Sequence, residues 1–258
     1  CAECLAEVAA EVRNIDGEVW MIKTCEEHGQ QRALLASDAA FYWEPQAGSK
    51  GSGCCVDNRS CTLIFEVTER CNLTCPTCFT ASSPELTWHM AVDELASKLD
   101  ALLEGGKRDV DIVQVSGGEP TVHPDIERMI EVCFERGVKR VYLNSNGIRL
   151  ARDEAFADRL GAINAAGGDQ RLQIYLQFDG FRDDTYAQIR GASGLSRVKR
   201  QALERSLAAG IYVLPVMTVT RGINLDEIGA VVALAQEHHP RTNSVILQPA
   251  VHAGKLRL

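Results

Sequence analysis

The sequence predicts an α/β protein, a partial (β/α)6 TIM barrel preceded by a small metal-binding module. Two observations carry this prediction. Six short runs rich in apolar and β-branched residues alternate with amphipathic helical patterns between residues 62 and 247, whereas the first 60 residues carry paired cysteines and a Gly/Ser linker. Strands that alternate with helices along a chain form a parallel sheet with the helices on its outer face.

Composition narrows the class of partner and the compartment. The net charge of −8 disfavours nucleic acid as the main partner, because phosphate binding needs a basic surface. No apolar run reaches the ~20 residues that cross a bilayer and no signal peptide is visible, although contact with a membrane surface stays open. Ten cysteines without a secretory signal predict metal ligation in a reducing compartment, the cytoplasm.

Two domains are expected. Residues 1–60 would form the cysteine-rich module with its linker, and residues 61–258 the barrel. The chain opens at Cys1, already inside a motif, and stops at Leu258 just after the last predicted strand. We therefore expect a piece of a longer protein, with the barrel truncated at its C-terminus.

The N-terminal module carries two pairs of metal-ligating residues. Cys1 and Cys4 form a CxxC knuckle, and Cys25 and His28 follow a predicted strand over residues 17–23. Units of this size seldom fold on hydrophobic burial alone, and four such ligands can hold one tetrahedral iron or zinc ion. We expect Cys1, Cys4 and Cys25 to bind it, with either His28 or a later cysteine as the fourth ligand.

The later cysteines are Cys54, Cys55 and Cys61, which follow the Gly/Ser linker at residues 48–53. They are candidate ligands of the same auxiliary iron or zinc. The alternative is that Cys55 and Cys61 are buried, unligated thiols, because a free cysteine packs as a small hydrophobic residue.

The barrel region reads as alternating strands and helices. The predicted strands are residues 62–68, 110–115, 138–143, 172–178, 211–219 and 245–247. The predicted helices are residues 87–104, 123–136, 153–165, 195–209 and 225–237. Gly105, Gly137 and Gly210 fall at helix C-termini and Asn224 at an N-cap, which are positions that these residue types prefer.

Three cysteines stand just beyond the first predicted strand. Cys71, Cys75 and Cys78 have the spacing CxxxCxxC, and the loop at this end of a barrel strand is where such folds place their chemistry. Three thiolates are one fewer than a closed zinc site or a fully ligated [4Fe-4S] cluster needs. One iron of such a cluster would therefore be open to another ligand.

Polar residues follow the other predicted strands. The second strand ends in Ser116-Gly-Gly-Glu-Pro120, where the glycines let backbone groups approach a ligand and Glu119 offers an acceptor to a cationic amine. The further candidates are Asn144, Asn146, Gln177, Asp179, Arg190, Thr218 and Gln248. Each alone could be a turn former or a solvated surface residue, but their recurrence at strand ends predicts a pocket.

CxxxCxxC after one strand and Gly-Gly-Glu-Pro after the next resemble the radical S-adenosylmethionine (SAM) superfamily. The resemblance implies that Cys71, Cys75 and Cys78 hold a [4Fe-4S] cluster, whose fourth iron is chelated by the amino and carboxylate groups of SAM. It implies an enzyme that reductively cleaves SAM to a 5′-deoxyadenosyl radical, which abstracts hydrogen from an unactivated C–H bond. A ferredoxin or flavodoxin would donate the electron.

The resemblance also assigns SAM contacts. Gly117, Gly118 and Glu119 would contact the amino group, and Arg190 would pair with the carboxylate. The expected contacts to the ribose or carboxylate, with their neighbours on the same strand ends, are Gln177, Asp179, Asn144, Asn146, Thr218 and Gln248.

The N-terminal pattern is similar to the group that contains tetraether lipid synthase and dihydropterin methyltransferase. A CxxC pair, Asp16-Gly-Glu-Val19, and Cys25 with His28-Gly29 precede the cluster motif in this order. In that group the N-terminal cysteines bind a rubredoxin-like iron and auxiliary clusters. The implied substrate is a lipid chain or a pterin, and the implied reaction is C–C bond formation or SAM-dependent carbon transfer.

Two alternatives stay open at this stage. The first is a radical SAM enzyme that modifies a peptide, which further cysteine motifs beyond the barrel would favour. The second, from a different class, is a non-catalytic metal-binding protein, which a failure to cleave SAM would favour.

Overall fold

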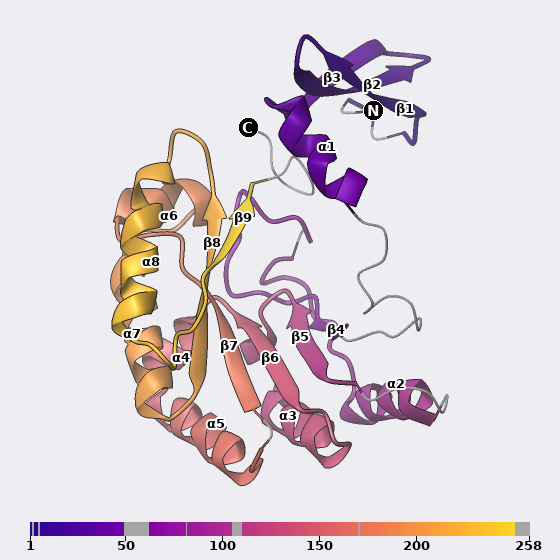
Figure 1. Ribbon diagram of the computed structural model, residues 1–258. Helices are drawn as coiled ribbons and strands as arrows, with labels where there is room; N and C mark the ends of the chain where they lie inside the picture. Colours follow the sequence, from indigo (N-terminus) through magenta and orange to yellow (C-terminus); the bar gives the residue numbers. More distant parts are fainter. Residues whose placement is uncertain are drawn as a thin grey trace. The chain divides into compact units, whose positions relative to one another are not determined.

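The computed structural model describes residues 1, 3–4, 6–48, 62–80, 82–104, 110–169 and 171–250 (Figure 1). The chain divides into two compact units, Cys1–Arg59 and Ser60–Leu258. The predicted fold class, an α/β half-barrel with an N-terminal metal-binding module, is confirmed. Within the part of the chain that is described, no helix is both long and apolar enough to cross a bilayer.

The N-terminal unit is an antiparallel sheet in the order β1-β2-β3 followed by one helix. Its elements are β1 (Ala10–Ile15), β2 (Glu18–Cys25), β3 (Gly29–Ala36) and α1 (Ala39–Gly48). Asp16 and Gly17 both have positive φ, as a tight turn between two hairpin strands requires. Of these three strands, the sequence analysis predicted only β2. The strands β1 and β3 are almost wholly exposed, and an exposed strand needs no alternation of apolar and polar residues by which it could be recognised.

The second unit is a six-stranded parallel sheet whose strands lie in chain order. The strands are β4 (Thr62–Thr68), β5 (Ile112–Gly117), β6 (Arg140–Ser145), β7 (Arg171–Gln177), β8 (Tyr212–Val219) and β9 (Ile246–Pro249). All six predicted strands are therefore present, and sequential right-handed crossovers explain why neighbours in sequence are neighbours in the sheet.

Helices follow the strands and lie against one face of the sheet (Figure 1). They are α2 (Val92–Glu104), α3 (Ile126–Glu135), α4 (Ile148–Arg152), α5 (Glu154–Ala166), α6 (Asp183–Arg190), α7 (Leu195–Ala208) and α8 (Ile228–Glu237), with 3-10 turns η1 (Pro120–Val122) and η2 (Leu225–Glu227). Helix α2 begins at Val92 and not at residue 87, because His89 forms a bridge with Thr68 and Met90 N donates to Val67 O (2.8 Å).

The short helices α4 and α6 were not expected from the sequence. Helix α6 is mostly polar and buries only Thr185, Tyr186 and Ile189.

The core between sheet and helices contains Val113, Val115 and other fully buried strand residues, packed with side chains such as Leu95 of α2. The alternate strand residues face away from these helices, since successive side chains on a strand point to opposite faces.

Candidate functional site

The three cysteines of the CxxxCxxC motif lie half-buried on the loop that follows β4. This loop is tied to the rest of the unit: Cys71 N donates to Ser83 O (3.1 Å), and Thr77 Oγ1 donates to Ile189 O (2.9 Å) on α6. Burial raises the pKa of Cys71 to about 12, and Glu119, Cys75 and Cys78 add to the shift. Burial likewise raises the pKa of Cys75. Desolvated neighbouring thiols fit a cationic metal centre, which would neutralise their thiolates.

The glycine pair of β5 packs directly on the segment that leads into Cys71. A Cβ at Gly117 would clash with the Thr68 carbonyl, and a Cβ at Gly118 with the Arg70 carbonyl. Gly118 N donates to Thr68 O (2.7 Å), and Glu119 N donates to Arg70 O (2.9 Å). The glycines therefore have a packing role that the sequence did not indicate, since they join the second strand end to the base of the cysteine loop.

We expect Gly118→Ala to lower the free energy of unfolding by about 1–3 kcal/mol, because the added methyl group meets backbone atoms that cannot move aside cheaply. Chemical denaturation measures this change. Gly229→Ala is the matched control: nothing lies within 4 Å of its Cβ position in α8, so this change should be neutral or stabilise by up to about 1 kcal/mol. Equal losses in the two variants would contradict the packing role.

The Glu119 carboxylate is buried and hydrogen-bonded inside the protein. It accepts hydrogen bonds from Thr121 N (3.2 Å) and Oγ1 (2.6 Å), from Ser145 Oγ (2.8 Å) and from Asn146 N (2.6 Å). These bonds hold the end of β5 to the end of β6. The predicted contact between Glu119 and the SAM amino group stays a prediction; what the structure adds is this internal role.

Asp179 and Arg190 form a buried ion pair behind the cysteine loop. Asp179 Oδ2 and Oδ1 accept from Arg190 Nε and Nη2 (both 2.8 Å), and the Asp179 side chain is fully buried. Arg190 also donates to Thr218 Oγ1 (2.8 Å) and to Cys75. Although burial opposes the charge of Arg190, its pKa lies above the usual value because of Asp179. Arg190 is therefore not a solvated surface residue.

Lys199 of α7 is a fully buried charge that the sequence analysis missed. Its Nζ donates to Gln177 Oε1 (2.7 Å) and to the carbonyl of Asn146, and burial lowers its pKa to about 7. A signal for it exists in the sequence: Leu195, Lys199, Ala202 and Ser206 share one helical stripe, and all four are buried. A lysine on a helical stripe of otherwise small or apolar residues indicates that its amino group has a polar partner inside the protein.

The remaining predicted residues lie on neighbouring strand ends. Asn144 Oδ1 accepts from Gln114 Nε2 and Asn144 Nδ2 donates to Ser116 Oγ (both 3.0 Å). Asn146 Nδ2 donates to Asn72 Oδ1 (2.6 Å), beside the first cysteine. The exposed Gln248 pairs in register with Thr218. The carboxyl ends of β4 to β9 thus bring these residues to one edge of the sheet.

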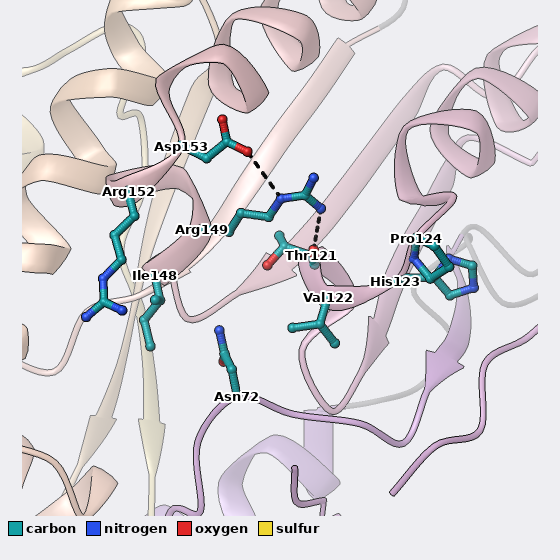
Figure 2. Close-up of a pocket in the computed structure, with 9 residues that line it drawn as sticks. All are labelled: Asn72, Thr121, Val122, His123, Pro124, Ile148, Arg149, Arg152 and Asp153. Atoms are coloured by element: carbon teal, nitrogen blue, oxygen red, sulfur yellow. Dashed lines mark hydrogen bonds and ion pairs between the residues drawn. The ribbon is translucent and has the colours of Figure 1, made fainter. Parts of the chain in front are cut away.

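A cavity of about 470 Å³ opens next to the cysteine loop (Figure 2). Its lining residues are Asn72, Thr121, Val122, His123, Pro124, Ile148, Arg149, Arg152 and Asp153. Arg149 donates to the Thr121 carbonyl (2.6 Å) and lies 3.7 Å from Asp153, whereas Arg152 is exposed. Of these lining residues, only Asn72 stands next to a predicted metal ligand in the sequence, because it follows Cys71.

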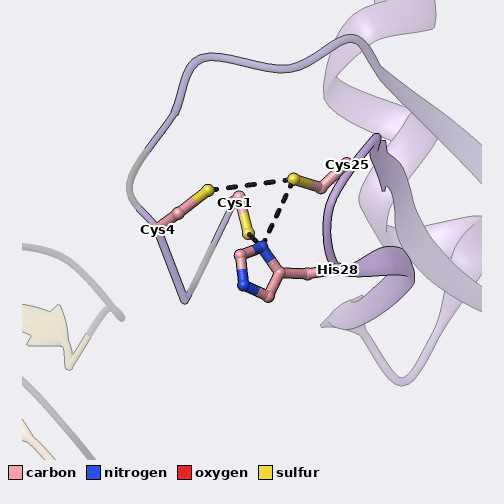
Figure 3. Close-up of side chains that lie close together, drawn as sticks. All are labelled: Cys1, Cys4, Cys25 and His28. Carbon is pink, nitrogen blue, oxygen red and sulfur yellow. Dashed lines mark hydrogen bonds between the residues drawn. The ribbon is translucent and has the colours of Figure 1, made fainter.

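The N-terminal unit brings four metal-ligating side chains together (Figure 3). The Sγ atoms of Cys1 and Cys25 lie 3.7 and 3.6 Å from His28 Nδ1, and those of Cys4 and Cys25 lie 3.8 Å apart. All four ligand atoms lie within 4.8 Å of one another, which suits one tetrahedral ion. His28 is thus the fourth member of this group of candidate ligands; Cys54, Cys55 and Cys61 lie outside the described residues.

The hydrogen bond with His28 lowers the pKa of Cys25 to about 7, so this thiol is readily available as a thiolate ligand. Among the described residues 1–48, the buried hydrophobic side chains are only Val19, Cys25 and Ala39. A core this small supplies little stability, so a metal ion bound to these four side chains would contribute much of the folding free energy of the unit.

Removal of the metal by a chelator is therefore expected to unfold β1–β3. Amide hydrogen exchange should show loss of protection in these strands and unchanged protection in β4–β8. His28→Ala should reproduce the loss without chelator, and His239→Ala, at the exposed end of α8, should not. Retained protection in β1–β3 after metal removal would contradict a structural role for the ion.

Comparison with known proteins defines the class. A family model described as the radical SAM superfamily matches residues 65–235, and the chain belongs to this superfamily. A second model, the HMPTM N-terminal zinc ribbon domain, matches residues 1–37, which include all four ligands in Figure 3. The predicted resemblance is confirmed, and the match of residues 1–37 to a zinc ribbon domain supports the predicted small N-terminal metal-binding module.

Two relatives show the breadth of the family. The chain is 28% identical over 280 residues to the 7,8-dihydro-6-hydroxymethylpterin dimethyltransferase of Methanocaldococcus jannaschii, covering 99% of this chain and 53% of that protein. It is 34% identical over 185 residues to the GTP 3′,8-cyclase of Chlorobaculum tepidum, covering 71% of this chain and 52% of that protein. The chain thus spans about half the length of these relatives.

Solved structures show the same fold. Streptococcus suis SuiB bound to S-adenosylmethionine superposes with a TM-score of 0.62 at 13% identity, covering 98% of this chain and 66% of SuiB. The anSMEcpe enzyme with bound AdoMet gives a TM-score of 0.56 at 20% identity, covering 74% of this chain and 51% of that one. At these identities the likeness concerns the fold alone.

Proposed function

We propose that this chain holds a [4Fe-4S] cluster through Cys71, Cys75 and Cys78 and cleaves SAM reductively. When bound, the cluster and SAM together supply a 5′-deoxyadenosyl radical that takes hydrogen from an unactivated C–H bond. The observation that supports this most is that the loop with the three half-buried cysteines is hydrogen-bonded at its base to Gly118 and Glu119, at the same edge of the sheet.

The protein's own residues would bind and orient SAM. The proposed contacts are Gly117, Gly118, Glu119, Asn144, Asn146, Gln177, Asp179, Arg190, Thr218 and Gln248. For Glu119 and Asp179, whose oxygens already accept internal hydrogen bonds, we propose that the carboxylates position the segments that touch SAM. Arg190 would fix the Cys75 side chain through its hydrogen bond.

The proposed reaction is C–C bond formation or carbon transfer on a lipid or a pterin, with a ferredoxin or flavodoxin as electron donor in the cytoplasm. The pterin is supported by the match to the dihydropterin dimethyltransferase, which spans the zinc ribbon as well as the barrel. Peptide modification has less support, because its basis is the likeness of fold, at 13% identity and a TM-score of 0.60, to SuiB bound to a precursor peptide.

The test is anaerobic reconstitution with iron and sulfide, followed by addition of SAM and dithionite. Formation of 5′-deoxyadenosine is the expected result, and liquid chromatography measures it. If the reconstituted chain yields no 5′-deoxyadenosine above a protein-free blank, the proposal fails and metal binding without catalysis becomes the better description.

A further inference from the structure

The face of the sheet that points away from the helices has an unusual composition. On β5, β6 and β7, Val113, Val141 and Ile174 are fully buried in the core beneath the helices. Their successors Gln114 and Tyr142, together with other alternate residues, therefore point to the opposite face, where they are only half-buried. The interior of a barrel is ordinarily filled by branched apolar residues, so amides and phenols here need another explanation.

The strand register arranges these residues in a row across the sheet. Gln114 pairs with Tyr142, Tyr142 with Gln173, and Gln173 with Tyr212, so amides and phenol rings alternate over four strands. The row lies two residues before Ser116 and Asn144 on their strands, which is roughly 7 Å further from the carboxyl ends at about 3.3 Å per residue. A ligand on this row would therefore lie beneath the proposed SAM contacts.

Two contacts give the row a defined shape. Tyr175 lies opposite Asn144, one layer nearer the carboxyl ends than the row, and its ring contacts that of Tyr142, with centroids 4.6 Å apart and planes inclined by 41°. The Gln114 amide is oriented by its bond to Asn144 Oδ1 and keeps its Oε1 acceptor for another group. The amide of Gln173 has no hydrogen-bond partner within residues 62–250 as far as these are described.

We propose that Gln114, Tyr142, Gln173 and Tyr175 form the recognition surface for a flat nitrogen heterocycle with an amide-like edge, the chemical class that includes pterins. The rings would stack on the heterocycle and the two amides would pair with its donors and acceptors. This inference rests on the proposed function, and it selects the pterin over the lipid. A hydrocarbon chain on this row would leave both amides without partners, at a cost in affinity.

The test is equilibrium dialysis of 6-hydroxymethylpterin against the whole reconstituted chain, with and without SAM. Wild type should retain the pterin. Tyr142→Ala and Tyr175→Ala should each weaken binding about tenfold, because stacking on an aromatic side chain is worth about that much, whereas the Phe variants should stay within about threefold. Gln173→Leu should weaken binding about fivefold or more through the lost hydrogen bonds.

Controls separate this inference from a folding defect and from the proposed function. Tyr42→Ala, in α1 of the other unit, should bind like wild type, and each variant's circular dichroism spectrum should match wild type. No pterin retention by wild type, unchanged retention in both Tyr→Ala variants, or displacement of the pterin by equimolar adenosine or palmitate would overturn the recognition surface. Selective pterin loss in the variants without 5′-deoxyadenosine formation would uphold the surface and reject only the proposed radical chemistry.

Discussion

Cys75→Ala is expected to abolish both the iron–sulfur absorbance near 400 nm and SAM cleavage in the reconstituted chain. With one of three thiolates removed, the cubane keeps too few protein ligands, and no second cysteine on the described loop can replace it. Cys75 is also the thiol to which Arg190 of α6 donates, which helps to fix its position. Ultraviolet–visible spectroscopy and the 5′-deoxyadenosine assay measure the two losses.

Cys133→Ala is the matched control for this experiment. Cys133 is fully buried in α3 within the hydrophobic core, and burial raises its pKa to about 12, so it packs as a thiol rather than as a ligand. The variant should keep cluster absorbance and SAM cleavage and lose about 1 kcal/mol of stability through the missing sulfur atom. Equal loss of cluster in the two variants would undo the ligand assignment.

The strands of the barrel could be predicted from the sequence because the patterns that indicate them are local. Buried parallel strands need continuous apolar runs, and each run predicted here became a strand in the expected order. The cysteine trio and the glycine pair could be placed at strand ends for the same reason. Helix α6 was not predicted because its sequence is mostly polar. The helix is stabilised by the burial of Tyr186 and Ile189 against the rest of the unit, which no local pattern reveals.

Side-chain partnerships across the fold could not be predicted in the same way. The proximity of His28 to Cys1, 27 positions away in the sequence, depends on the turn between β2 and β3, which no local pattern reveals. The sequence analysis assigned Arg190 to SAM or to solvent; its contact with SAM stays a prediction, and its ion pair with Asp179 inside the protein was not foreseen. The row of Gln114, Tyr142 and Gln173 becomes visible only once the register of three strands is known.

Asp179→Ala is expected to be strongly destabilising while it leaves all cysteines in place. It would leave the Arg190 guanidinium, whose side chain is only 12% exposed, without its carboxylate partner. Breaking a buried pair from one side costs about 3–5 kcal/mol, because an uncompensated charge stays inside. The Asp179 carboxylate also accepts from Thr218 N (3.0 Å), which would lose its partner as well. Chemical denaturation measures the change.

Asp226→Ala provides the contrast, because Asp226 pairs with Arg182 at the surface with side chains 67% and 41% exposed. Its loss should cost less than about 1 kcal/mol, since water solvates the freed arginine. Combining Asp179→Leu with Arg190→Met should recover part of the stability lost by Asp179→Ala, because removing both charges also removes the desolvation penalty. A double variant that is less stable than Asp179→Ala would contradict this explanation. The attraction within the ion pair, and not the uncompensated charge of Arg190, would then account for the loss of stability.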